Sequence, residues 1–263
     1  MSRIASAFAR CARNREGALV CYLTAGFPDE ERSIELMLRC EESGADILEI
    51  GMPFSDPVAD GPTIQRASQV ALESGMTPAR VLELVARLRS SSSMPIVLMG
   101  YYNPIYRIGE REFALRAAAA GADGLIVADL PYEESSGLAG TCEPRGLDLV
   151  QLVGPTTSDV RMREIANASR GYLYLVGSLG TTGARPRLSS ELPDLTSRAR
   201  RAANGLPVAV GFGVSDREQV REVVRCGAEG VIVGSALLNL IQGGGTATDL
   251  GDFVADLKSG CLR

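Results

Sequence analysis

The apolar positions of the chain form short, nearly continuous runs that recur directly after a glycine. The clearest runs are residues 45–50 after Gly44, 122–127 after Gly121 and 228–233 after Gly227, with looser copies after Gly146 and Gly171. Glycine readily adopts the left-handed conformation that closes a helix, and near-continuous apolar strands are typical of a parallel sheet covered on both faces. The pattern therefore predicts a repeating unit that consists of a helix, a closing glycine and a buried strand.

Three more apolar runs, residues 18–24, 95–99 and 207–210, raise the number of predicted strands to eight. Polar-apolar stretches between them predict helices near residues 30–42, 63–90, 110–120, 134–143, 158–169, 188–203, 215–226 and 235–241. Helix starts are indicated by Thr77-Pro78, by Ser158-Asp159 and by a capping box of Ser215 with Glu218. Eight alternating units in this length predict an α/β fold of the closed (β/α)₈ TIM-barrel type, and the eighth strand disfavours a doubly wound open sheet.

The first fifteen residues predict one further element. Ile4, Phe8 and Cys11 share one face of a short amphipathic helix. A basic, acid-poor start also resembles a transit peptide, but the first strand follows almost at once. We therefore expect one barrel domain over residues 1–263, with residues 1–15 as a capping helix.

Composition narrows the class of protein. The net charge is −5 with no block of like charges, which argues against a nucleic-acid or anionic-membrane surface. No apolar run is long enough to span a bilayer. The six cysteines are scattered without a paired motif or an export signal, so we expect reduced thiols in a cytoplasmic protein.

Two absences bear on the chemistry. The chain contains no histidine, and its only lysine is Lys258. A zinc site normally uses histidine, and a Schiff-base aldolase needs a lysine on a barrel strand. We therefore predict no metal site, and proton chemistry that relies on carboxylates, tyrosines or a bound cofactor.

The ends of the predicted strands carry candidate reacting groups, since barrel enzymes place their chemistry there. Glu49 lies inside an apolar strand, where a carboxylate is unfavourable without a partner or a function. The loop after it supplies Asp56 and Asp60. A structural carboxylate and ordinary turn residues remain alternatives at this point.

Glycine-rich loops follow the last three predicted strands, at residues 177–183, 211–213 and 234–235. Backbone N–H groups of such loops, together with the start of a helix at Ser235, suit an anion. A single loop of this kind would indicate only a turn, but three at neighbouring strand ends predict a phosphate site. No nucleotide-binding motif is present, so a phosphorylated small molecule is expected.

At residues 48–62 the chain closely resembles the tryptophan synthase α-subunit family. The resemblance spans nearly the whole chain and includes residues 22–26, 101–104, 128–131, 171–174, 182–185, 211–213 and 234–235. It implies a retro-aldol cleavage of indole-3-glycerol phosphate to indole and glyceraldehyde-3-phosphate in tryptophan biosynthesis, with no cofactor in this subunit. Gly100, Leu179 and Thr181 depart from the family pattern, and they bear on loop closure more than on chemistry.

The resemblance also assigns roles to individual residues. Glu49 and Asp60 would be catalytic, Tyr174 would orient the reacting hydroxyl, and Tyr22, Tyr102 and Phe212 would form pocket walls. Gly183, Gly213, Gly234 and Ser235 would bind the phosphate. Pro53, Asp56 and Asn103 would contact a pyridoxal-phosphate-dependent β subunit in an α₂β₂ heterotetramer.

Three other functions stay open on the sequence alone. Another phosphate-binding barrel, such as a sugar-phosphate isomerase or epimerase, would share the glycine loops but would leave residues 53–62 unexplained. A weakly active subunit that mainly activates a β partner would not need both Glu49 and Asp60. A free-standing indole-releasing lyase would share every catalytic residue.

Overall fold

The computed structural model describes residues 1–177, 190–211 and 213–263. Eight parallel strands close into a barrel in sequence order. The strands are β1 (Ala18–Thr24), β2 (Ile47–Gly51), β3 (Ile96–Gly100), β4 (Gly124–Val127), β5 (Asp148–Val153), β6 (Leu173–Val176), β7 (Val208–Gly211) and β8 (Gly230–Val233). Pairing of β1 with both β2 and β8 closes the ring, so the predicted (β/α)₈ barrel is confirmed.

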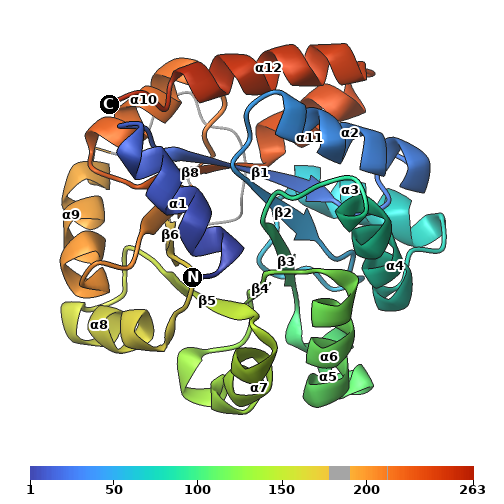
Figure 1. Cartoon of the computed structure of the whole chain (residues 1–263), viewed down its shortest axis with the longest axis horizontal. Coiled ribbons are helices and arrows are strands. Elements are labelled where there is room, and N and C mark those ends of the chain that lie inside the picture. The colour runs from blue at the N-terminus through green and yellow to red at the C-terminus, as the bar shows by residue number, and fades with distance from the viewer. Residues whose placement is uncertain (178–189, 212) are drawn as a thin grey trace.

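Helices surround the strands (Figure 1). They are α1 (Arg3–Arg13), α2 (Glu30–Glu42), α3 (Pro62–Glu73), α4 (Pro78–Arg89), α5 (Tyr102–Ile108), α6 (Glu110–Ala120), α7 (Ser136–Cys142), α8 (Asp159–Ala168), α9 (Leu192–Ala203), α10 (Arg217–Arg225), α11 (Ser235–Gln242) and α12 (Ala247–Ser259), with short 3₁₀ turns at Tyr132–Glu134 and Glu143–Arg145. Outward strand residues such as Leu48 and Ile50 pack on this helical ring, while inward residues such as Ile47 and Val97 form a second core inside the barrel.

Most local signals in the sequence are borne out. The five glycines of the repeat all have positive φ, namely Gly44, Gly121, Gly146, Gly171 and Gly227. Thr77 and Ser158 cap α4 and α8 through their side chains. The capping box of Ser215 and Glu218 was wrong, because the cap of α10 is Asp216, whose side chain accepts from the Gln219 N–H.

The predicted helix near 63–90 proved to be two helices. α3 ends before Gly75, whose φ of +83° turns the chain, and α4 starts at Pro78. Two helices were not anticipated, α5 directly after β3 and α12 at residues 247–259.

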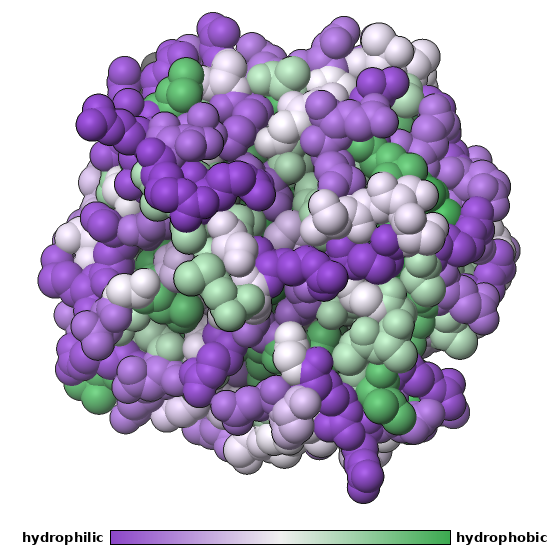
Figure 2. Space-filling view, in the orientation of Figure 1, coloured by the Kyte–Doolittle hydropathy of each residue, from purple (hydrophilic) through white to green (hydrophobic). Residues whose placement is uncertain are grey.

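The predicted N-terminal helix is α1, and it closes the mouth of the barrel at the N-terminal ends of the strands. Ile4, Phe8 and Cys11 are buried against the inward-facing residues, and the Phe8 ring lies 5.6 Å from that of Tyr172. In Figure 1, α1 lies across the strands on the side facing the viewer. Hydrophilic side chains cover most of this face (Figure 2). The interior of the barrel is thus sealed from water at this end.

Acidic residues at the strand starts hold this end together. Asp46, Asp123 and Glu229, the third residues of the Gly-Ala-acid repeats, each accept a backbone N–H from a neighbouring strand, from Leu19, Ile96 and Val208 respectively. Each also accepts from a basic side chain. The repeat therefore encodes a ring of carboxylates whose charges are all compensated.

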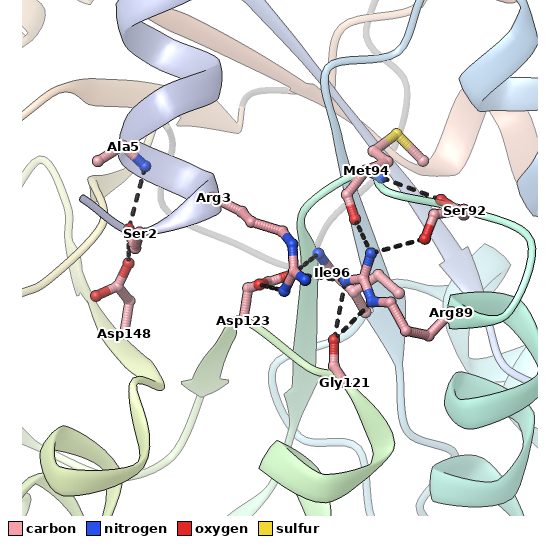
Figure 3. Close-up of polar contacts among 10 residues, drawn as sticks. All are labelled: Ser2, Arg3, Ala5, Arg89, Ser92, Met94, Ile96, Gly121, Asp123 and Asp148. Carbon is pink, nitrogen blue, oxygen red and sulfur yellow. Dashed lines mark hydrogen bonds and ion pairs between the residues drawn. The ribbon is translucent and has the colours of Figure 1, made fainter.

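Two of these carboxylates, together with Asp148, attach α1. Arg3 donates to Asp123 at 2.9 Å, Arg10 donates to Asp46 at 2.9 Å, and Ser2 donates to Asp148 at 2.7 Å. Figure 3 shows Asp123 between Arg3 and Arg89. Only 15% of the Arg89 side chain is exposed, and it also donates to the backbone oxygens of Gly121, Ser92 and Met94. Asp123 is consequently the anchor that has a largely buried basic partner.

We expect Asp123→Ala to lower the free energy of unfolding by about 3 kcal/mol, because it leaves the guanidinium of Arg89 buried without its counterion. Chemical denaturation of the full chain measures this. Arg3→Ala is the matched control: the Arg3 side chain is 55% exposed, so losing its ion pair should cost less than about 1 kcal/mol. Equal losses in the two variants would contradict the role given to Asp123.

Candidate active site

Glu49 occupies the interior of the barrel. It stands in β2 between Tyr22 of β1 and Val97 of β3, and it has no exposed surface. The alternation of β2 sends Ile47 and Glu49 inward and leaves Leu48 and Ile50 on the outer face. Neither carboxylate oxygen has a hydrogen-bond partner among the residues that the structure describes. Burial raises the pKa of Glu49 from its ordinary 4.5 to about 8.

Asp60 lies at the end of the loop that joins β2 to α3. It is 7% exposed, and burial raises the pKa of its carboxyl to about 6, against a lowering hydrogen bond from the Tyr101 hydroxyl. Tyr101 also accepts the Ala59 N–H at 3.1 Å, and its ring lies 5.4 Å from that of Phe54. Tyr101 therefore holds both ends of this loop.

Tyr22 and Tyr174 place two further hydroxyls beside the carboxylates. Both side chains are buried, and this burial is the main reason that the pKa of each phenol lies well above 10. The negative charges of Glu49 and Asp60, when ionised, raise it further. Each ring occupies space that a glycine leaves free. A Cβ on Gly51 would lie 2.0 Å from the Tyr22 oxygen, and one on Gly211 would lie 2.3 Å from the Tyr174 oxygen. Glycine at these strand ends is therefore required by the tyrosines.

One predicted pocket wall, Tyr102, has its hydroxyl bound to a neighbouring helix. Tyr102 is the first residue of α5, and its hydroxyl donates to Glu110 of α6 at 2.9 Å. Its neighbour Tyr101 takes the place beside Asp60. Strand alternation was the signal that could have found it, since Val97 and Met99 face inward and residue 101 is next in that phase.

The expected phosphate-binding residues lie at the ends of β7 and β8, which are adjacent in the barrel. Gly213 has a φ of +66°, Gly234 is the N-cap of α11, and Ser235 is its first residue. The first turn of a helix presents N–H groups without helical partners and a partial positive charge. Gly183 and Phe212 lie outside the described residues, as do Leu179 and Thr181.

The expected partner-contact residues differ in exposure. Asp56 and Asn103 are exposed, whereas Pro53 is buried within the chain. The same two segments also expose apolar side chains, Val58 at 78% and Tyr106 at 68%. Isolated exposed apolar residues are ordinary, but these two lie in the segments that follow the adjacent strands β2 and β3, Val58 in a loop and Tyr106 in α5.

No metal-binding group of three or more acidic, cysteine or histidine residues occurs within the described ranges. Lys258 donates to Asp46 at 2.7 Å and pairs with Glu16 at 3.0 Å, beside the end that α1 closes. The only lysine is therefore engaged far from Glu49. Among the described residues, Glu49 and Asp60 are accompanied by three phenols, those of Tyr22, Tyr101 and Tyr174.

Glu49→Gln should change how stability depends on pH. The pKa of Glu49 is raised on folding, so the wild-type chain loses stability as pH rises from about 4.5 to about 8, by on the order of 4 kcal/mol. Glutamine removes this loss. The free energy of unfolding of the variant, measured by urea denaturation, should therefore rise relative to that of the wild type between pH 5 and pH 9. Exposed Glu83 supplies the control, since Glu83→Gln should keep the wild-type slope. Parallel curves for Glu49→Gln and wild type would contradict a buried, unpaired carboxyl.

Known proteins of one family are similar to this chain over nearly its full length. The sequence model of the family described as "Tryptophan synthase alpha chain" matches residues 8–257. The chain is 47% identical to the tryptophan synthase alpha chain of Citrifermentans bemidjiense, over 100% of this chain and 99% of that protein. It is 46% identical to that of Methanosarcina barkeri, over 99% and 98%.

Solved structures give the same result. Mycobacterium tuberculosis tryptophan synthase superposes with a TM-score of 0.93 at 38% identity, covering 100% of this chain and 99% of that one. The tryptophan synthase alpha chain of Legionella pneumophila superposes with a TM-score of 0.89 at 37% identity, covering 99% and 97%. The chain that carries Glu49 and Asp60 in this barrel belongs to the tryptophan synthase alpha chain family.

Proposed function

We propose that this chain is a lyase that cleaves indole-3-glycerol phosphate to indole and glyceraldehyde-3-phosphate by carboxylate acid–base catalysis. The observation that carries the proposal is the Glu49 carboxyl, which is buried beside Asp60 without a partner among the described residues, in a barrel of this family. A buried acid without a structural partner is unfavourable for folding and is typical of a functional site.

Glu49 moves the protons. With a pKa of about 8 it is protonated at neutral pH, so it can donate its proton to C3 of the indole ring. The carboxylate that remains then accepts the proton of the C3′ hydroxyl. The bond between indole and glycerol breaks, its electron pair returns to the ring, and the hydroxyl oxygen becomes the aldehyde carbonyl. Glu49 ends the cycle protonated, as it began.

Asp60 stabilises the charge that this protonation creates. With a pKa of about 6 it is ionised at neutral pH, and it accepts a hydrogen bond from the indole N–H. The ring becomes cationic when C3 is protonated, so a fixed anion at the nitrogen lowers the barrier. Two carboxyl groups in different surroundings thus take different roles, as in other acid–base enzymes. Tyr174 is the group that orients the C3′ hydroxyl.

The phosphate is bound at the other end of the site. Gly213, Gly234 and Ser235 offer backbone N–H groups at two adjacent strand ends, and α11 adds its positive terminus. A sugar-phosphate isomerase would use the same loops, but it gives no function to the loop that carries Asp60. The chain also has no histidine to serve as the electrophile that polarises the substrate carbonyl in such an isomerase.

Exposed Asp56, Val58, Asn103 and Tyr106 are the surface that we assign to a β subunit, in an α₂β₂ heterotetramer that uses pyridoxal phosphate in the β subunit and no cofactor in this one. Buried Pro53 would act by shaping the loop. We place the protein in the cytoplasm, consistent with six cysteines that form no disulfide. No helix in the described part of the chain is long and apolar enough to cross a membrane.

Indole release from indole-3-glycerol phosphate, with and without a β subunit, tests the function. We expect slow release alone and fast release with the partner, a bell-shaped pH profile of kcat/KM with limbs near 6 and 8, and no release by Glu49→Gln. Asp60 must be ionised, so kcat/KM falls as pH drops below about 6. Glu49 must be protonated, so kcat/KM falls as pH rises above about 8. Fast release without the partner would indicate a free-standing lyase. Failure of the wild type in both assays would leave only a partner-activating role.

Ser235→Asp tests the phosphate site separately. A carboxylate at the first position of α11 repels the phosphate dianion but suits the helix terminus, so the fold should be retained. We expect KM to rise at least about 100-fold with kcat changed much less. Ser235→Asn, similar in size and uncharged, is the control and should stay within about tenfold of wild type. An unchanged KM in Ser235→Asp would place the phosphate elsewhere.

A further inference from the structure

The Tyr22 side chain spans the distance between the two ends of the site. A Cβ on Gly234 would lie 3.1 Å from the Cβ of Tyr22, and a Cβ on Gly51 would lie 2.0 Å from its hydroxyl oxygen. The ring therefore starts beside the glycine at the end of β8 and ends over the glycine that follows Glu49 and Ile50. Both glycines leave room for it, so its direction is fixed by the backbone of β2 and β8.

The Tyr22 hydroxyl is a neutral donor in charged surroundings. Burial, and then the charge of Asp60, keep its pKa well above 10 against the lowering effect of the Thr24 side chain, so it holds its proton throughout the working pH range. A phenol that neighbours two carboxyl groups is more than an apolar wall. It can donate to one oxygen of a ligand and accept from another.

The substrate has a group at the matching position. Its phosphate is assigned to Gly234 and Ser235, and the carbon that parts from indole is assigned to Glu49. Two carbons of the glycerol chain lie between these two points, the phosphate ester carbon and the middle carbon, and the second of these carries the middle hydroxyl. We propose that the Tyr22 hydroxyl binds this middle hydroxyl and selects substrates that carry it. The inference rests on the function proposed above and assigns a contact that the reaction itself does not require.

The contact would act on recognition rather than on proton transfer. The middle hydroxyl is neither made nor consumed in the cleavage. A hydrogen bond to it fixes the rotation of the chain between two anchored ends, which aligns the bond to be broken with Glu49. A site that hydrogen-bonds a substrate hydroxyl also disfavours analogues without one, since its own polar group is then left unpaired.

The test compares two ligands in wild type and Tyr22→Phe, in the complex with the β subunit. One ligand is indole-3-glycerol phosphate, and the other is the inhibitor in which propanol phosphate replaces glycerol phosphate and both hydroxyls are missing. We expect Tyr22→Phe to lower kcat/KM about five- to tenfold, as for the loss of one neutral hydrogen bond. The inhibition constant of the propanol analogue should stay within about twofold.

Each other outcome overturns the inference. Equal weakening of both ligands would show that only the packing of the ring matters, and an unchanged kcat/KM would show that the hydroxyl makes no contact. Tyr132→Phe, at a phenol whose hydroxyl donates to Glu164 of α8 at 3.0 Å, is the control and should change neither value.

Failure of the proposed function would look different. In that case wild type would not release indole at all, and the contact could still be measured by titration calorimetry with glycerol 3-phosphate and propyl phosphate. Preference of wild type for glycerol 3-phosphate, lost in Tyr22→Phe, would support the contact. The absence of any preference would overturn it.

Discussion

The chemistry that we propose for this barrel depends on one unfavourable burial, that of the Glu49 carboxyl inside the ring of strands. Around it the interior is filled with apolar side chains such as Ile47 and Val97, and α1 closes the end below. No described residue donates a hydrogen bond to it, so desolvation alone brings its pKa to about 8. The backbone hydrogen bonds of β2 to β1 and β3 prevent the strand from turning the side chain out to water. An acid that is protonated at neutral pH is therefore a consequence of barrel closure.

The two ends of the barrel use the same residue types in opposite ways. At the N-terminal ends of the strands, Asp46, Asp123 and Glu229 are each paired with a basic side chain and a backbone N–H. At the C-terminal ends, Glu49 and Asp60 have no basic partner among the described residues, and both pKa values are raised. Compensated carboxylates stabilise the fold, and uncompensated ones are available for proton transfer. The stability of α1 matters to the site because it keeps water from reaching Glu49 from below.

The features that could be predicted from the sequence are those that depend on residues close together in the chain. Glycine closure, apolar runs and the caps Thr77 and Ser158 depend on neighbouring residues, and they predicted the barrel correctly. The cap of α10 was misplaced by one residue because Ser215 and Asp216 are both good capping residues, and the packing of the helix decides between them. Tyr101 was missed because both residues of the tyrosine pair look alike in sequence, and only the inward phase of β3 separates them. The contacts of α1 join residues up to 146 positions apart, which no local pattern encodes.

Glu49 and Asp60 are held in place by different parts of the fold. A bound partner would therefore affect the two carboxyls differently. Glu49 is fixed by strand pairing, so a protein bound at the surface has little means of moving it. Asp60 stands on a loop whose middle exposes Asp56 and Val58 and whose base is held by Tyr101. If a β subunit binds this surface as we propose, it would therefore act on the loop that carries Asp60, to which we assign charge stabilisation, and would leave Glu49, to which we assign proton transfer, in place. Under this proposal, coupling between subunits changes how well the cationic ring is stabilised, while the proton donor is already in place in the isolated chain.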